Sequence, residues 1–410
     1  MPAIWGARLS DGQRAALRPG RPDDLDRCPD VLVVGGGAVG LAVAVACQRA
    51  GLGRTLVLER EPELATAASG ANAGTIAPDM HVATDSPEFV AFGRAGRALY
   101  RELDAEWGGA IGLWPTRWLN VFGPGQAPLV TRQAPGIPPA DRPAADRPTA
   151  DRPAADRPAT DESAADGFYV LDAGGVRALE PDVRLPQGGS ALLVEGQLGV
   201  NPLRLAGALA AHAGPIATGT AMRGVTIRGD RIVAVRTSAG DITPGAVVVA
   251  TGLVPAPWAT GVPQRWIKGH MLAVGPGPWR LGSVLGGALG GGTPLADGSV
   301  VCGGTFDEDD STPDVRPEVA DSLAAELALV LPAAAGATVT HRWCCFRPYI
   351  DGRQPVIDRL PGVVNGWFAG GHFTTGIMMA AGTGAAVASW VAGSRRPESV
   401  RTFDLPLRRS

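Results

Sequence analysis

The sequence predicts an α/β protein in which a second, strand-rich domain is inserted into a parallel-sheet domain. The first observation is a short apolar run at 31–34, followed at once by a glycine-rich turn and a helix-like stretch at 38–50. The second is a series of short strand-like segments between 217 and 306 that do not alternate regularly with helices. The third is another glycine-rich segment, at 370–377, which opens a stretch of small residues typical of a closely packed helix.

The first glycine-rich turn has the spacing Gly35-x-Gly37-x-x-Gly40. Gly35 permits the tight turn, Gly37 lets the backbone approach a pyrophosphate, and Gly40 lets the helix pack closely on the strand. The free N–H groups at the helix start, from Ala38 and Val39 onward, and the positive end of the helix dipole favour phosphate binding.

A second strand is predicted at 55–58, and it ends at Glu59 and Arg60. A carboxylate at this position would accept a hydrogen bond from a ribose 2′-hydroxyl. Because strand, helix, second strand and acidic residue occur together, we predict a Rossmann-like site for an adenine dinucleotide; the alternative is a glycine-rich turn that binds nothing. Together with the segment at 370–377, the turn indicates one dinucleotide held along its length, which points to FAD.

Composition sets outer bounds on the class of protein. The 410 residues, 45% hydrophobic and 19% charged, are ordinary for a globular protein of two or three domains. A net charge of −3 gives no sign of a nucleic-acid surface. We expect no signal peptide in 1–29 and no membrane span. The five cysteines form no zinc pattern, so we expect no metal site and a reduced, cytoplasmic compartment.

Residues 138–162 contain repeats of the unit ADRPA. Proline, alternating charge and the lack of apolar side chains beyond alanine predict a disordered or extended insertion, because such a segment cannot offset its ordering entropy by burial. A tolerated expansion of a surface loop explains it; a docking role is the alternative.

Further elements follow from periodicity and capping. Ser86 is expected to cap a helix that begins at Pro87. Helices are predicted at 86–107, 203–213 and 317–331, and strands at 224–227, 232–236, 246–250, 266–274 and 300–306. We therefore divide the chain into an N-terminal extension at 1–29, an FAD-binding domain from 30–105, 195–262 and 341–405, and an antiparallel-sheet substrate domain from 106–194 and 263–340.

Five segments, in this order, resemble the FAD-dependent D-amino acid oxidase superfamily in its glycine oxidase, sarcosine oxidase and D-amino acid dehydrogenase branch. They are VVGGGAVG with Glu59, ASGANAG at 68–74, VVVATG at 247–252, IKGHM at 267–271, and Phe346-Arg347-Pro348 together with GHFTTGI at 371–377. The likeness covers about 30–405 apart from the repeat. The ASGANAG segment is most similar to glycine oxidases and to the flavin subunits of opine oxidase and hydrogen cyanide synthase.

The resemblance implies oxidation of a carbon–nitrogen bond next to a carboxylate, with a hydride passing to flavin N5 and an imine as product. It also implies that a helix starting near Gly371 aims N–H groups at the flavin's pyrimidine oxygen, with His372 in the flavin cradle rather than acting as a base. The FAD-binding residues expected from motif and resemblance are Gly35, Gly37, Ala38, Val39, Gly40, Glu59, Arg60, Ser69, Asn72, Ala73, Gly74, Val225, Ala250, Thr251, Gly252, Gly371, His372, Phe373, Thr374, Thr375, Gly376 and Ile377.

Arg347 is the candidate substrate anchor. Its Phe-Arg-Pro setting is similar to the family's Leu-Arg-Pro, where the arginine binds the substrate carboxylate, and a guanidinium fork suits that task. The alternative is a structural arginine paired with Asp351 or Asp358. The chain departs from glycine oxidases, which carry a second arginine where Thr374 stands and a Pro-Asp-Gly turn that is shifted here to Asp351-Gly352. These departures disfavour a simple substrate such as glycine.

Cys345 lies nearest to the position at which monomeric sarcosine oxidase attaches its flavin. A covalent link there is the alternative to noncovalent FAD, which the Arg347-Pro348 pair favours. Free cysteines are usually buried residues that only pack, which also speaks against a covalent link. Sarcosine oxidases also use a lysine beside the flavin for oxygen reactivity, and the aligned strand has His270, with Lys268 two residues earlier. His270, Tyr349 and Lys268 are thus candidate pocket residues, and each could instead be structural.

The leading functional hypothesis is an FAD-dependent amine or amino-acid oxidase that reduces O2 to H2O2. One alternative is a dehydrogenase, or the flavin subunit of a complex, that passes electrons to a quinone or partner. The other is a non-catalytic flavoprotein. The expected partner is a small amine or amino acid, with no nucleic acid and no membrane span; a homo-oligomer is compatible with the sequence.

Overall fold

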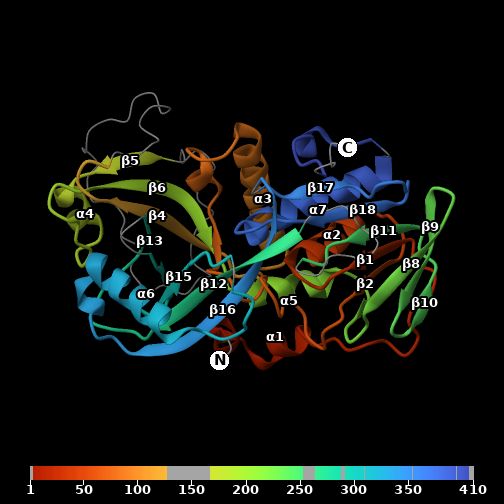
Figure 1. Cartoon of the computed structure of the whole chain (residues 1–410), viewed down its shortest axis with the longest axis horizontal. Coiled ribbons are helices and arrows are strands. Elements are labelled where there is room, and N and C mark those ends of the chain that lie inside the picture. Colours follow the sequence, from red (N-terminus) through yellow and green to blue (C-terminus); the bar gives the residue numbers. More distant parts are fainter. Residues whose placement is uncertain are drawn as a thin grey trace.

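The computed structural model describes residues 3–126, 167–252, 264–287, 291–308, 310–352, 354–393 and 395–405. The predicted repeat insertion at 138–162 lies outside these residues. Figure 1 shows a half built on a parallel sheet beside a half built on antiparallel strands, in agreement with the predicted fold class.

The parallel half is a six-stranded sheet with the order β17-β18-β11-β1-β2-β7. Its strands come from distant parts of the chain, and all neighbours run parallel except β17 and β18. The strands predicted at 31–34 and 55–58 are confirmed. The sheet consists of β1 (Val31–Val34), β2 (Thr55–Leu58), β7 (Ile216–Ala217), β11 (Ala246–Val249), β17 (Val356–Arg359) and β18 (Gly366–Gly370).

Four helices pack with this sheet in the larger core: α2 (Ala38–Arg49), α3 (Pro87–Glu106), α5 (Pro202–His212) and α7 (Gly376–Gly393). The Ser86 hydroxyl caps α3 as predicted, accepting from the N–H of Phe89. By length and composition α7 is apolar enough to cross a membrane, although the sequence analysis expected no such segment, and in this fold it is mostly buried against α2 and α3. Gly384 permits this packing, because a Cβ there would lie 2.4 Å from the carbonyl oxygen of Ala42.

The N-terminal segment is packed into the fold. It forms the 3-10 turn η1 (Ile4–Arg8) and helix α1 (Asp11–Ala16), which lies on α5. Trp5 is only 1% exposed and packs in a buried cluster that includes Trp343 of the other half. Sequence patterning set this segment apart as an extension, because one buried tryptophan in a polar stretch has no periodicity to reveal it.

A three-stranded sheet follows α5, with the order β10-β9-β8. It is formed by β8 (Met222–Arg228), β9 (Arg231–Thr237) and β10 (Gly240–Ile242). Val235 and Ile242 bury themselves against the outer face of the parallel sheet.

The antiparallel half contains two sheets. One has the order β14-β15-β12-β16; the other is β13-β4-β6-β3 with β5 also on β6. Their strands are β3 (Thr75–Ile76), β4 (Trp114–Phe122), β5 (Phe168–Leu171), β6 (Ser190–Gly199), β12 (Gln264–Val274), β13 (Val284–Gly287), β14 (Thr293–Pro294), β15 (Val300–Gly303) and β16 (Val339–Ile350). The remaining short elements are α4 (Ala173–Leu179), α6 (Pro317–Val330), η2 (Pro78–His81), η5 (Pro332–Ala334) and η6 (Glu398–Val400).

Two expectations from sequence differ from the structure in this half. The strand predicted at 300–306 is too long: β15 ends at Gly303, because Gly303 and Gly304 adopt φ angles of +150° and +126° and turn the chain away. The division points at 194/195 and 340/341 fall inside β6 and β16, which are continuous strands. The division into domains stays a prediction.

The close approach of α2 and α7 gives a test of the fold. Gly384→Ala should lower the free energy of unfolding by about 1–3 kcal/mol, because the new methyl group meets backbone rather than a movable side chain. Gly393→Ala in the same helix is the matched control, since a Cβ there meets nothing within 4 Å. Urea unfolding measures the free energy of unfolding of both variants. An equal change in the two would show that α7 does not lie this close to α2.

Candidate active site

A cavity of about 490 Å³ lies between the two halves. Loops that follow β1, β2 and β11 form one end of it, and β12, β16 and the start of α7 form the other. The expected residues that line it are Gly35, Gly37, Val39, Glu59, Arg60, Ser69, Asn72, Ala73, Ala250, Thr251, Gly252, Cys345, Arg347, His372, Phe373, Thr374, Thr375, Gly376 and Ile377.

The glycine turn after β1 is built for close backbone contact. A Cβ on Gly35 would lie 2.3 Å from the carbonyl oxygen of Ala250, and one on Gly40 would lie 1.9 Å from that of Gly35. Gly40 and Ala38 do not line the cavity; Gly40 instead lets α2 pack closely on the segments that follow β1 and β11. Any larger residue at Gly35 or Gly40 would push the N-terminus of α2 away from the cavity.

The carboxylate of Glu59 is fixed at the carboxyl end of β2. Its Oε2 accepts from the N–H of Gly36 at 2.7 Å, and its Oε1 accepts from the N–H of Glu61 at 2.9 Å. The N-cap of α2 is Gly37, which has no side chain to cap the helix start, and Ser69 Oγ accepts from the N–H of Ala38 at 3.0 Å. A helix N-terminus beside an oriented carboxylate fits the phosphates and ribose of an adenine dinucleotide.

The ASGANAG loop is held by Asn72. Its Nδ2 donates to the carbonyl oxygens of Ala68 and Ser69, at 3.2 and 2.7 Å, while its Oδ1 accepts from the N–H of Gly74 at 2.8 Å. The indole N–H groups of two buried tryptophans outside the loop also donate hydrogen bonds to it. Trp5 Nε1 donates to the carbonyl oxygen of Asn72 at 2.8 Å. Trp343 Nε1 donates in the same way to Ala71, at 2.9 Å.

The far end of the cavity is formed by the start of α7. His372 contacts Thr383 through Nε2 at 3.0 Å, and Thr375 Oγ1 donates to the carbonyl oxygen of His372 at 2.8 Å. Burial lowers the pKa of His372 to about 4, so its imidazole is neutral near pH 7. A neutral, buried imidazole whose Nε2 is bonded to Thr383 of α7 suits a role in shaping the cradle.

Arg347 lies in the same cavity with its side chain buried, 8% exposed. One guanidinium nitrogen donates to the carbonyl oxygen of Thr305 at 2.7 Å, and the Phe306 ring centroid is 4.7 Å from its Cζ. Burial lowers the pKa of Arg347 below its usual value, yet the group stays charged because that value is so high. Across the described ranges, no carboxylate forms an ion pair with Arg347.

The structural alternative for Arg347 required a pairing with Asp351 or Asp358. Asp351 instead pairs with Arg265 at 3.4 Å. Asp358 lies 3.8 Å from Arg396 and accepts from the N–H of Leu405 at 3.0 Å. Both carboxylates have other partners, so neither forms the ion pair that the structural alternative required.

The structure places several candidates outside the cavity wall. Lys268 and His270 lie on the face of β12 that points away from it, because strand side chains alternate and Met271, their neighbour on the opposite face, lines the cavity. The pocket position expected for these two residues is therefore corrected. Tyr349 lies behind Phe373, with ring centroids 5.2 Å apart.

Three residues expected to bind FAD also lie outside the cavity wall: Val225, Gly74 and Gly371. Val225 on β8 packs beside the outer face of the parallel sheet. Gly74 and Gly371 turn the chain with φ angles of +71° and +67°, and neither lines the cavity itself.

Sequence reasoning missed several residues of the wall: Met80, His81, Trp118, Met271 and Phe306. Met271 could have been found from strand alternation within the IKGHM segment. Met80 and His81 come from the 3-10 turn η2, Trp118 from β4 and Phe306 from the loop after β15, and no motif marks any of them. Apart from His81, these side chains bring no ionisable group to the wall.

Comparisons with known proteins agree with this geometry. A family model described as FAD dependent oxidoreductase matches residues 30–390. Among curated proteins, the chain is 30% identical to D-amino acid dehydrogenase 2 of Mesorhizobium japonicum and 29% identical to glycine oxidase of Pseudomonas aeruginosa, over 44% and 39% of this chain. The matched segments span 44% and 45% of those relatives, less than half of either.

Solved structures share the fold over almost the whole chain. Glycine oxidase from Bacillus cereus superposes with a TM-score of 0.74 at 20% identity, covering 93% of this chain and 99% of that one. L-proline dehydrogenase from P. horikoshii gives 0.75 at 16% identity, covering 93% and 97%. These likenesses confirm the predicted fold class.

The clamp on the ASGANAG loop gives a second test. Trp5→Phe keeps most of the ring but removes the N–H donated to Asn72, so the loop should loosen and the Kd for FAD should rise about fivefold, as expected for one lost hydrogen bond. Titration of the apoprotein with FAD measures this. Trp107→Phe is the control, because Trp107 stacks on His212 away from the cavity. Equal FAD affinity in both variants would remove Trp5 from the cofactor site.

Proposed function

The chain belongs to the family of FAD-dependent oxidoreductases, and we propose that it oxidises the carbon–nitrogen bond of an amino acid, or of a related amine that bears a carboxylate. The observation that carries the proposal is Arg347, a buried guanidinium in the cavity wall with no carboxylate partner among the described residues. A buried charge without a counter-ion is costly, so a ligand carboxylate is the natural partner. The names of the curated relatives, an amino acid dehydrogenase and a glycine oxidase, support the same substrate class.

Different residues of the cavity would have different roles in this reaction. Arg347 would bind the carboxylate through the guanidinium nitrogens that Thr305 does not use, which fixes the direction of the neighbouring carbon–nitrogen bond. Bound FAD would supply the oxidising group that takes up two electrons from that bond. Gly376 and Ile377 at the start of α7 line the cavity, and the positive end of this helix would stabilise negative charge there. Met80, Trp118 and Met271 would exclude water from the reacting carbon.

Thr374 lines the cavity where the glycine oxidases resembled by this chain carry a second arginine. A neutral threonine offers no second charge, so the proposal favours a substrate with one carboxylate and an apolar remainder over glycine itself. The apolar wall formed by Met80, Trp118, Met271 and Phe306 favours the same class.

Oxygen is the proposed electron acceptor, with a quinone or protein partner as the alternative. The relatives carry both oxidase and dehydrogenase names, so they do not decide between these. No lysine lines the cavity in the part of the chain that the structure describes, and Lys268 is bonded elsewhere. Oxygen reactivity would therefore not use the lysine that sarcosine oxidases place beside the flavin. Formation of H2O2 during turnover in air separates the two acceptors.

Arg347→Met tests the proposal. Loss of the charged fork should lower kcat/KM for the best amino-acid substrate by about 100-fold or more, mainly through KM, since each charge-assisted hydrogen bond contributes about 1.5–3 kcal/mol. Turnover is followed with a panel of D- and L-amino acids, proline and sarcosine. Arg342→Met on the same strand is the control and should leave KM unchanged. Equal kinetics in the two variants would contradict the anchoring role, whereas a lack of turnover in the unchanged protein with the whole panel would favour a non-catalytic flavoprotein.

We also propose that FAD is bound without a covalent link. Cys345 lines the cavity, but burial raises the pKa of its thiol above the usual value, although the charge of Arg347 acts in the opposite direction. A protonated thiol is a poor nucleophile. Acid precipitation of the holoprotein should therefore release all of the yellow flavin and leave the polypeptide mass unmodified. A polypeptide that keeps the mass of FAD, and loses it in Cys345→Ser, would establish the covalent alternative.

A further inference from the structure

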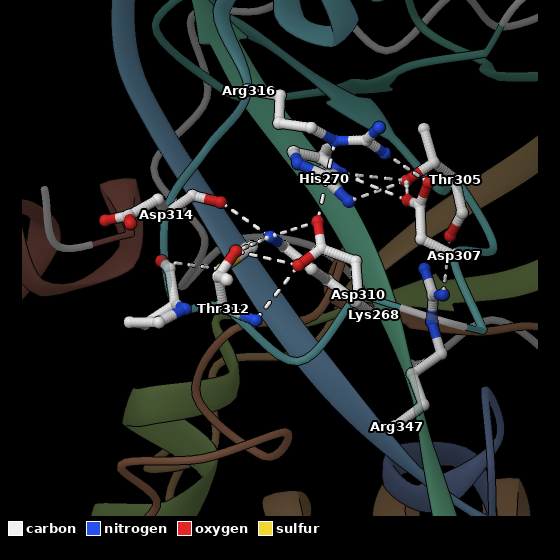
Figure 2. Close-up of polar contacts among 11 residues, drawn as sticks. Lys268, His270, Thr305, Asp307, Asp310, Thr312, Asp314, Arg316 and Arg347 are labelled. Carbon is white, nitrogen blue, oxygen red and sulfur yellow. Dashed lines mark hydrogen bonds and ion pairs between the residues drawn. The ribbon is translucent and has the colours of Figure 1, made fainter.

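Lys268 is the only lysine in the chain, and it is fully buried. Its ammonium group has three N–H donors, and three acceptors surround it: Asp310 Oδ2 at 2.8 Å, Thr312 Oγ1 at 3.2 Å and the carbonyl oxygen of Asp314 at 2.7 Å. All three belong to the loop between β15 and α6 (Figure 2). A buried lysine is rare unless it is paired in this way, so this position has a specific task.

His270 holds the same loop two residues further along the face of β12. Its Nδ1 lies 3.1 Å from Asp307 Oδ2 and 3.2 Å from Thr305 Oγ1. Although partial burial would raise the pKa of Asp307, hydrogen bonds from Thr305 and His270 lower it, so Asp307 is a carboxylate that accepts from both. Asp307 also pairs with Arg316 at the start of α6.

The loop is bonded to the backbone of β12 as well. The N–H of Lys268 donates to the carbonyl oxygen of Asp307 at 3.0 Å, and the N–H of Asp307 donates back at 2.9 Å. Beyond this bridge the loop crosses the far face of the sheet, where Cys344 Sγ donates to the carbonyl oxygen of Pro313 at 3.1 Å.

Successive side chains of the loop point to opposite sides, and this brings one of them to Arg347. Thr305 and Asp307 point to His270, and Phe306 between them points to the cavity face. There the carbonyl oxygen of Thr305 accepts from Arg347 at 2.7 Å, and the Phe306 ring lies against the guanidinium (Figure 2 shows the contact with Thr305). Gly269 leaves the room for this arrangement, since a Cβ there would lie 2.2 Å from an Arg347 nitrogen.

We propose that residues 304–308 and 310–316 form a strap that sets the position of the Arg347 guanidinium, and that Lys268 and His270 are the positioning residues that hold the strap in place. The inference rests on the proposed function, in which Arg347 binds a substrate carboxylate. It gives the only lysine and the buried histidine roles in substrate affinity although neither touches the cavity. It also explains why a lysine suits this position, because three donors on one nitrogen match three acceptors that a planar guanidinium would not fit.

The first experiment measures carboxylate binding to the holoprotein. Acetate and benzoate are titrated while the visible band of bound FAD is followed. Asp310→Asn and Asp307→Asn should each raise the Kd about five- to tenfold with FAD content unchanged, since each weakens a charge-assisted hydrogen bond that holds the strap. Phe306→Ala should raise it as well, and Phe306 is 59% exposed, so its truncation leaves the core intact. Glu308→Gln is the control on the same strap, because its pair with Arg265 is exposed.

A double-mutant cycle shows whether the strap acts through Arg347. The effect of Asp307→Asn should disappear in an Arg347→Met background, because no guanidinium remains to be positioned. A general loss of structure would lower carboxylate binding equally in both backgrounds, and that result would overturn the proposal.

The single lysine provides a readout that does not depend on activity. Acetic anhydride should acetylate Lys268 slowly in the native holoprotein, as measured by mass spectrometry with the α-amino group as internal reference. Asp310→Asn should speed this at least about tenfold, and Glu308→Gln should not, because only the first weakens the contact that shields the ammonium group.

The outcomes separate the two proposals. If Arg347→Met raises the Kd for carboxylates while the strap variants leave it unchanged, the anchor stands and the strap is overturned. If Arg347→Met itself leaves the Kd unchanged, the anchoring role in the proposed function fails, and the strap fails with it. Fast acetylation of Lys268 in the native protein would also overturn the strap.

Discussion

The long pairing of β12 with β16 is the constraint on which the candidate site depends. The two strands run antiparallel from Gln264 opposite Ile350 to Val274 opposite Val339. Because side chains alternate along each strand, this register sends Met271, Cys345 and Arg347 into the cavity and turns Lys268 and His270 to the other face. A slip of one residue would exchange the two sets, so the ladder fixes both the anchor and the contacts that hold its strap.

The cofactor end depends on short distances between backbone segments. Strands β1, β11 and β18 lie side by side although they come from distant parts of the chain, and their carboxyl ends meet at the cavity. Glycines at the points of contact allow α2 to approach β11 and α7 to approach α2. The N–H of Phe373 donates to the carbonyl oxygen of Pro348 at 2.9 Å, which joins the start of α7 to the end of β16. The start of α7 is thereby linked through the backbone to the strand that carries Arg347.

Local sequence was sufficient for the first unit of the parallel half, whereas strands β17 and β18 of the same sheet were not predicted. The strand–glycine turn–helix–strand unit from Val31 to Glu59 was predicted to the residue at both strands, since its motif is contiguous. The side of the sheet to which Lys268 and His270 point was not predicted, because it depends on the partner strand, which lies in a different part of the sequence. The role of Trp5 was not predicted for a similar reason: its hydrogen bond to Asn72 spans 67 residues and leaves no local pattern.

Anaerobic mixing of the purified holoprotein with single amino acids and amines, followed at the visible band of its flavin, tests the central claim most directly. The account predicts that at least one substrate bearing a carboxylate bleaches this band, and that the same amine without its carboxylate does not. Bleaching that is equally fast for amines with and without a carboxylate would contradict the role given to Arg347. A flavin that none of them reduces would contradict the proposed oxidation of an amino-acid carbon–nitrogen bond.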